Sequence, residues 1–218
     1  MDSKALERIF SPERLQPYLK RHNNNFNHAI DHYRANILIS EAFYPLISIL
    51  EIGLRNGVNN QLIKKFNGND WFETKDFIKI ASSFQIETIS KARNSILQEK
   101  KEITSGRIIA ELSFGFWTSL FDARYEMTLW KNLRLVFPAC PKMIRQRKNI
   151  SSKLNGIRKL RNRIFHQEAI SWDVSVIKSY RNEISEGIQW LDRDLLNWSE
   201  DLFRIDDVIE KATGIIAR

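Results

Sequence analysis

The sequence predicts an all-α protein, and three observations lead to this fold class. Apolar side chains recur at helical spacing, as at Ile109, Leu112 and Phe116. Eight glycines and five prolines are few for 218 residues, and no Asn-Gly turn connects two alternating runs. Hydrophobic residues make up 43% of the chain, which is too many for a disordered protein and enough for a packed core. We expect one domain, with an N-terminal helical part over residues 1–70 and a helical bundle over residues 71–218.

Local signals mark the ends of the helices in order along the chain. Ser11, Pro12 and Glu13 predict a helix start, with Ser11 as the N-cap and Pro12 in the first turn. A long helical tract should follow over residues 26–66, and Pro45 should divide it because proline removes a backbone donor and crowds the preceding turn. The segment Asn67–Asp70 should end this tract. Further helices are expected over residues 75–101, 105–121, 125–137, 142–165, 174–198 and 205–216.

One stretch, residues 37–54, is apolar enough to suggest a membrane span, but Glu41, Pro45 and Glu51 interrupt it. Since an ionised carboxylate in hydrocarbon costs roughly 2.5 kcal/mol or more, we expect a buried core helix and no membrane association. The first four residues lack the apolar core of a signal peptide. The single cysteine, Cys140, excludes an intrachain disulfide and suits a reducing compartment. A cytoplasmic location is therefore expected.

Positive charge is concentrated in one part of the chain. The net charge is +8, which favours a polyanionic partner. Between Lys142 and Arg163 there are nine Lys or Arg and no Asp or Glu, whereas residues 181–210 carry nine acidic and three basic side chains. These two segments either pack together or face different partners.

The basic segment ends on the sequence Leu160-Arg161-Asn162-Arg163-Ile164-Phe165-His166. Histidine can exchange a proton near neutral pH, and arginine is a planar donor suited to phosphate. The structural alternative is that an Arg and a His near a helix C-terminus only stabilise the helix dipole. On a helix, Arg161 and His166 lie about 140° apart, so one copy does not direct both at a single phosphate. Two copies meeting about a two-fold axis would do so.

Helical geometry also separates the faces of this segment. Five apolar residues should gather on the side that faces the core: Ile150, Leu154, Ile157, Leu160 and Ile164. Arg158, Asn162 and His166 recur at four-residue spacing on another side. Arg161 falls at the edge of the apolar stripe, where its stem can be buried while its guanidinium reaches out.

Arg161-Asn162, three residues and then His166 resemble the Arg-Asn-x-x-x-His signature of HEPN-domain ribonucleases. Further segments, from about Tyr33 to Ile170, are similar to the Abi-like (abortive infection) family. These segments are Ser40-Glu41-Ala42-Phe43-Tyr44-Pro45, Glu51 with Leu54-Arg55-Asn56, Asp70-Trp71-Phe72, and the run from Gly106 to Trp117. The resemblance implies a HEPN-like bundle with additional N-terminal helices and an active site at a homodimer interface. The chain departs from the family pattern after His166, where Gln167, Glu168 and Ala169 replace an expected second His and Glu-Pro.

The activity that the resemblance implies is a metal-independent endoribonuclease toxin of a phage-defence or toxin–antitoxin system, without a cofactor. Its catalytic residues would be Arg161, Asn162 and His166. His166 would act as general acid or base, Arg161 would stabilise charge on the phosphate, and Asn162 would orient His166 or hold a phosphate oxygen. The predicted RNA-binding residues are Arg158, Arg163, Lys159 and Lys153.

The expected substrate is RNA and not DNA, because the reaction needs the 2′-OH. An inhibitory RNA or protein antitoxin is the other expected partner. Two alternatives remain: a non-catalytic module that holds a structured RNA through the basic helix, and a structural protein whose basic segment docks on its acidic tail or on a partner. Glu51 and Arg55 have the spacing of an ion pair within an apolar run, so we expect them to be buried. Because both match a landmark of the Abi-like family, the resemblance implies that they support the active site, with a direct catalytic role as the alternative.

Other polar residues give weaker signals. His28 and His32 have the spacing of zinc ligands on a helix, but no partner set completes a metal site, so a surface pair is expected. Cys140 has no neighbour that would activate its thiol. There is no glycine-rich phosphate loop. Four tryptophans are expected in the core: Trp117, Trp130, Trp190 and Trp198.

Overall fold

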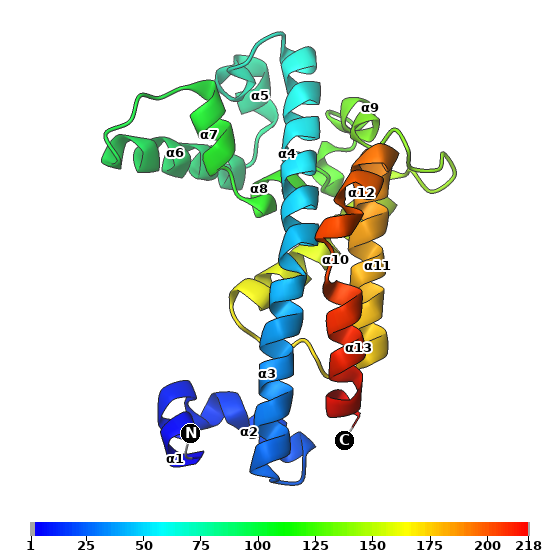
Figure 1. Cartoon of the computed structure of the whole chain (residues 1–218). Coiled ribbons are helices and arrows are strands. Elements are labelled where there is room, and N and C mark those ends of the chain that lie inside the picture. The colour runs from blue at the N-terminus through cyan, green and yellow to red at the C-terminus, as the bar shows by residue number, and fades with distance from the viewer. Residues whose placement is uncertain (1–2, 218) are drawn as a thin grey trace. The chain divides into compact units, whose positions relative to one another are not determined.

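The structure is a computed structural model that describes residues 3–217, and every regular element in this range is helical (Figure 1). The predicted all-α class is confirmed. The chain divides into two compact units, each built from segments far apart in sequence. Among the described residues, unit 1 comprises residues 3–47, 159–184 and 199–217, and unit 2 comprises residues 48–158 and 185–198. Helices α4 (Tyr44–Phe66), α10 (Arg147–Phe165) and α11 (Val174–Leu191) each contribute several residues to both units.

Unit 1 is organised around α3, which lies along α13 and also packs on α2 (Figure 1). These three helices are α2 (Pro12–Arg21), α3 (Phe26–Ala42) and α13 (Ile205–Ile216). Two shorter elements of the unit are α1 (Ser3–Phe10) and η4 (Glu200–Leu202). Both α3 and α13 present small and branched apolar residues that are fully buried, including Ile39, Ile209 and Ala212. Burying each isoleucine contributes about 1.5–3 kcal/mol.

A second core of unit 1 lies between α2 and α3. Tyr18 and Tyr33 are buried there, with ring centroids 5.4 Å apart in an edge-on arrangement. Trp172 packs on Tyr18 at 4.8 Å, so the loop that follows α10 belongs to this core. Burial raises the pKa of the Tyr18 phenol above its usual value.

Unit 2 has an aromatic core. Trp71 and Trp117 are fully buried, with their ring centroids 6.4 Å apart, and Phe77 packs edge-on against Trp71 at 4.8 Å. Trp71 Nε1 donates to Asn59 Oδ1 at 2.8 Å, which satisfies the one polar atom of the ring. Gly57 of α4 allows a close approach, because a Cβ at this position would lie 2.8 Å from Val136 Cγ1.

The other elements of unit 2 are mostly short. They are η1 (Trp71–Glu73), α5 (Lys75–Ile80), α6 (Ser83–Gln98), α7 (Ser105–Glu111), α8 (Phe114–Ser119), η2 (Ala123–Tyr125), α9 (Trp130–Leu133), η3 (Arg134–Val136) and α12 (Arg193–Ser199), which ends at the boundary with unit 1.

Several helix ends agree with their predicted signals. The tract 26–66 is divided at Phe43, just before Pro45, and it ends before Asn67, which has a left-handed φ of 57°. Pro12 is the first residue of α2 as expected, but the Ser11 side chain makes no capping hydrogen bond because Ser11 itself has a φ of 67°. Helix α13 has its predicted bounds.

Other predicted helices are interrupted. The expected helix 75–101 is divided at Ser82, whose hydroxyl accepts from Gln85 N while Gln85 Oε1 accepts from Ser82 N in a capping box. The expected helix 105–121 is divided at Ser113, which caps α8. The expected helix 174–198 is divided at Asp192, whose carboxylate accepts from the backbone of Asp194 and Leu195. In each case a polar side chain stabilises a new helix start.

Two further predictions about helices 125–137 and 142–165 are also corrected. Over residues 125–137 the only α-helix among the described residues is the single turn α9, flanked by 3-10 turns. Helix α10 begins at Arg147 rather than at residue 142.

Of the four tryptophans expected in the core, Trp117 and Trp190 are buried, Trp130 is half-buried and Trp198 is 69% exposed. The span Phe26–Phe66 is by length and composition apolar enough to cross a membrane, and 39% of its most apolar window is buried.

Candidate active site

Helix α10 carries the Arg-Asn-x-x-x-His motif at its C-terminal end. The apolar stripe predicted along this helix is buried at four positions, Ile150, Leu154, Ile157 and Leu160, whereas Ile164 is half-buried. The opposite residues are more accessible: Asn162 and His166 are exposed, and Arg161 is half-buried. The stripe therefore holds the helix in place while the polar residues of the motif face outward, as its spacing predicts.

His166 is the C-cap of this helix. Its N–H donates to Asn162 O at 2.9 Å. The next two residues close a Schellman motif, in which Glu168 N donates to Arg163 O at 2.8 Å and Gln167 N donates to Ile164 O at 3.0 Å. Gln167 occupies the left-handed position of this motif with a φ of 57°, where glycine is usual. The backbone that carries the His166 side chain is thus held by three hydrogen bonds.

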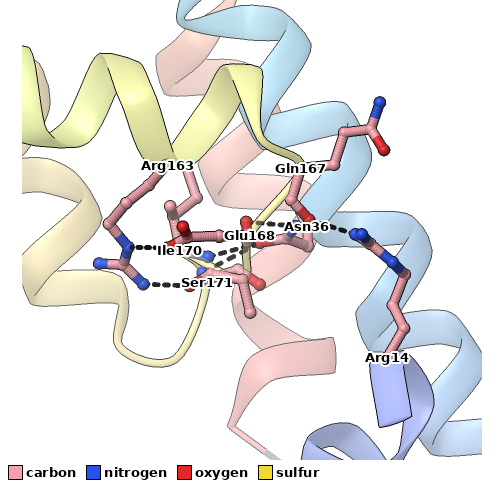
Figure 2. Close-up of polar contacts among 8 residues, drawn as sticks. Arg14, Asn36, Arg163, Gln167, Glu168, Ile170 and Ser171 are labelled. Carbon is pink, nitrogen blue, oxygen red and sulfur yellow. Dashed lines mark hydrogen bonds and ion pairs between the residues drawn. The ribbon is translucent and has the colours of Figure 1, made fainter. Parts of the chain in front are cut away.

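The loop after His166 is bound to α3 by a buried asparagine (Figure 2). Asn36 Oδ1 accepts from Ile170 N at 2.8 Å and from Ser171 N at 3.2 Å. Asn36 Nδ2 donates to Glu168 O at 3.4 Å. We call residues 167–172 the clamped loop.

Two arginines complete the attachment of the clamped loop (Figure 2). Arg14 of α2 donates from Nη1 to Gln167 O at 2.6 Å. Arg163 of α10 donates to Ala169 O, and its Nε lies 3.4 Å from Glu168 Oε2. Arg163 therefore has a structural part in the loop besides the RNA contact predicted for it.

A pocket of about 370 Å³ opens beside His166 within unit 1. Helix α2 lines it with Glu13, Arg14 and Tyr18, α3 contributes Tyr33, and the C-terminal end of α10 contributes His166. Hydrogen bonds from its own backbone N–H and from Ser11 hold the pKa of the Glu13 carboxyl below its usual range, so this carboxylate is ionised at neutral pH. Arg14 balances that charge, and the pocket offers both donors and acceptors next to an exposed imidazole.

Arg161 takes a different direction from His166. Its guanidinium lies over the Phe165 ring, 4.2 Å from the centroid. Phe165 is 47% exposed and Tyr44 is 58% exposed, with ring centroids 6.4 Å apart. The five-residue spacing between Arg161 and His166 predicts that their side chains point in different directions, but the contact of Arg161 with the Phe165 ring was not predicted. The sequence signal for that contact is the four-residue spacing between Arg161 and Phe165, which places the two side chains on one face of the helix.

The predicted RNA-binding residues are placed differently from one another. Lys159 is exposed and Arg158 is half-buried. Lys153 is largely covered: its Nζ lies 2.6 Å from Glu186 Oε2 and 5.0 Å from the Trp190 ring centroid. The ion pair joins the basic segment to the acidic segment within unit 2, so at this point the two segments pack together. Lys153 is a weaker candidate for phosphate binding than Lys159.

The expected surface pair of His28 and His32 is wrong. His32 is fully buried, and its Nδ1 lies 2.9 Å from Nε2 of His22, which is also buried. His32 Nε2 lies 2.8 Å from Ser171 O, so this histidine supports the clamped loop. Burial lowers the pKa of His32 below its usual value. Spacing along α3 suggested a partner four residues away, whereas the partner comes from the end of α2.

Glu51 and Arg55 are half-buried rather than buried, which corrects the prediction for this pair. Arg55 takes part in none of the ion pairs found among the described residues, and Glu51 is not without a partner. Arg55 instead lines a second pocket, in unit 2. Cys140 is buried, and burial raises the pKa of its thiol, which agrees with an unactivated cysteine. Over residues 3–217 no three His, Cys, Asp or Glu side chains form a group that could hold a metal ion.

Comparisons with protein-family models, with curated proteins and with solved structures find no match to this chain. The site combines an exposed histidine on a constrained backbone, a polar pocket beside that histidine, and a helix rich in positive charge.

Proposed function

We propose that the protein is a metal-independent endoribonuclease in which His166 is the proton-transfer residue. The observation that supports this most is the placement of His166. It is exposed, its backbone is held by the helix C-cap and the clamped loop, and it opens on a pocket large enough for part of a nucleotide. An acid–base group needs such a fixed position together with access to substrate.

The proposed reaction is attack of the RNA 2′-OH on the adjacent phosphorus. The 2′-oxygen loses its proton to a base, a P–O2′ bond forms and the P–O5′ bond breaks. An acid protonates the departing 5′-oxygen, so the products carry a 2′,3′-cyclic phosphate and a 5′-OH. His166 would serve as one of these two groups and solvent water as the other. Arg161 would stabilise the negative charge on the non-bridging oxygens.

The test is cleavage of a single-stranded RNA by purified protein in EDTA, with analysis of the product ends. We expect cyclic-phosphate ends and no cleavage of the matching DNA. His166→Ala should lower the rate by ~10²–10⁴, whereas Lys159→Ala removes an exposed charge from the same helix and should weaken RNA binding only modestly. A wild-type rate for His166→Ala would contradict the assignment.

A second candidate function is an RNA-binding module without catalysis. The stacking of Arg161 on Phe165 favours it, because an arginine over an exposed aromatic ring is also a binding surface for unpaired bases. Tight binding of a defined RNA without any cleavage product would establish this alternative. The role as a toxin in phage defence rests only on the resemblance to Abi-like proteins. Growth arrest on expression of the wild type, but not of His166→Ala, would test it.

A further inference from the structure

A second pocket, in unit 2, has the chemistry of an anion-binding site. It measures about 450 Å³ and lies between α4 and the start of α7. Arg55, Asn56 and Asn59 line it from α4, and Asn69 lines it from the loop after that helix. Pockets that hold small molecules have volumes in this range.

Charge in this pocket comes from Arg55 alone among the described lining residues. Its side chain is half-buried, and no described carboxylate pairs with it. A guanidinium that is partly removed from water and unpaired favours an anionic ligand, and its planar fork of donors suits phosphate.

The other lining residues are uncharged; Ser105 among them donates to Asp70 Oδ1, so one carboxylate lies next to the lining. Asn59 Oδ1 already accepts from Trp71 Nε1 at 2.8 Å, which directs the amide and leaves Nδ2 as a donor. Asn56 and Asn69 add further amides that can pair with ribose hydroxyls or a base edge. Ile63 and Ile109 supply apolar surface against which a flat ring can pack.

We propose that this pocket binds a nucleoside monophosphate unit, with the phosphate on Arg55 and the nucleoside among the three asparagines. The unit could be a free nucleotide or one nucleotide of an RNA strand, since both carry the same groups. The site lies apart in the sequence from the His166 motif, and its occupation does not depend on RNA cleavage.

Gly106 provides a way to close the pocket without disturbing the core. It lines the pocket in α7, and a Cβ built on it meets no atom within 4 Å. Gly106→Leu therefore adds a bulky side chain to the pocket lining without a clash at its Cβ. Gly214→Leu is a matched control, because Gly214 also lies in a helix, in α13 of unit 1, with no atom within 4 Å of the added Cβ.

The experiment is calorimetric titration of the full chain with AMP, GMP, CMP and UMP in EDTA. At least one should bind saturably below millimolar concentration, and the matching nucleoside and inorganic phosphate should each bind at least about 10-fold more weakly. Arg55→Gln should weaken nucleotide binding about 10-fold, as expected for loss of a charge-assisted hydrogen bond, and leave the nucleoside affinity unchanged. Gly106→Leu should abolish binding, and Gly214→Leu should retain it.

Competition by an unlabelled decaribonucleotide in the cleavage-deficient His166→Ala variant identifies the source: displacement of the nucleotide assigns the site to an RNA strand, and retention assigns it to free nucleotides. Nucleotide binding that is unchanged in both Gly106→Leu and Arg55→Gln would overturn the proposal, as would absence of binding by all four nucleotides. Circular dichroism of each variant shows whether it is folded, and Arg55→Gln keeps the test valid if Gly106→Leu is not.

Discussion

Gln167 is held in a left-handed conformation directly after the motif histidine. Its φ of 57° is one that residues with a Cβ adopt at a cost of roughly 1–2 kcal/mol. We expect Gln167→Gly to raise the free energy of unfolding by up to about 1 kcal/mol, because glycine removes this strain at some cost in chain entropy. Urea denaturation measures the change.

Gln167→Ala is the matched control for that prediction. Alanine removes the same side chain but keeps the Cβ, so it should give no such gain. The Arg14 hydrogen bond goes to the backbone oxygen of residue 167 and is retained in both variants. Equal stability of the two variants would argue that the left-handed backbone is not a source of strain.

His32 should make stability depend on pH. Burial lowers its pKa in the folded state, so the unfolded chain takes up a proton at a higher pH than the folded chain does. The contribution of His32 to the free energy of unfolding is therefore fully present above the ordinary histidine pKa of about 6.5. As the pH falls through and below that value, this free energy declines by at most about 1.4 kcal/mol per pH unit.

The measurement is urea denaturation at pH 7.5, 6.5 and 5.5. His32→Gln should be less stable at every pH, because it disturbs a buried contact, but it should lose less stability on acidification. His28→Gln, a change of a half-buried histidine in the same helix, should retain the wild-type slope. A slope that His32→Gln leaves unchanged would assign the effect to other groups.

At the scale of elements, Asn36 joins α3 to the clamped loop. Two backbone N–H groups, of Ile170 and Ser171, donate to its side-chain oxygen in a buried site. Asn36→Ala leaves both donors unpaired, and at about 1–3 kcal/mol for each buried unsatisfied group we expect a loss of about 2–6 kcal/mol. The amides of both residues should also exchange hydrogen faster, which mass spectrometry detects.

Asn155→Ala is a suitable comparison. Asn155 is half-buried on α10, and its amide donates only to Ser151 Oγ at 3.3 Å among the contacts of the described chain. The loss of stability should be well below that of Asn36→Ala, and exchange in the clamped loop should not change. Unaltered exchange at Ile170 in Asn36→Ala would mean that the other contacts of the loop are sufficient to hold it.

The helix ends show which features of the fold can be predicted from sequence. Pro45 and the segment Asn67–Asp70 are strong local signals for helix breaks, and both breaks are observed. The break at Ser82 was missed although Ser82 and Gln85 have the spacing of a capping box. Apolar residues recur at helical spacing across Ser82, and this periodicity outweighed the capping-box signal in the prediction. At Ser113 the same competition occurred.

At the scale of the whole molecule, we expect a symmetric homodimer. Arg161 stacks on Phe165 while His166 lines the pocket beside α2, so the two side chains of one copy take different directions. A second copy could supply the missing group. Light scattering at micromolar concentration, with and without RNA, should give twice the chain mass, and a strict monomer in both conditions would contradict the prediction.

Mixing two inactive variants sharpens this test. His166→Ala and Arg161→Ala should each be inactive alone. If the site is shared between copies, an equal mixture forms heterodimers that keep one His166 and one Arg161, and part of the activity should return. The control is His166→Ala alone at the same total protein concentration. If the mixture recovers no cleavage activity, the complete site lies within one copy.

The candidate site was only partly predictable. Periodicity of α10 gives the outward direction of Asn162 and His166, because it depends on residues a few positions apart. The contacts that fix the clamped loop could not be derived in this way, since Asn36 and Ile170 are 134 positions apart in the chain. Burial of His32 was missed for the same reason: its partner Ser171 is 139 positions away.

The Ser171 carbonyl has a consequence for the hydrogens of two imidazole rings. A carbonyl oxygen only accepts, so His32 must carry a hydrogen on Nε2 and, when neutral, offers Nδ1 as an acceptor. His22 must then donate from its own Nε2. Both rings are thereby locked in one tautomer, and nitrogen-15 NMR spectra should show two fixed Nε2–H signals without tautomer averaging. The two histidines thus form a chain of hydrogen bonds in which each ring donates to the next group, from His22 at the end of α2 through His32 to the Ser171 carbonyl of the clamped loop.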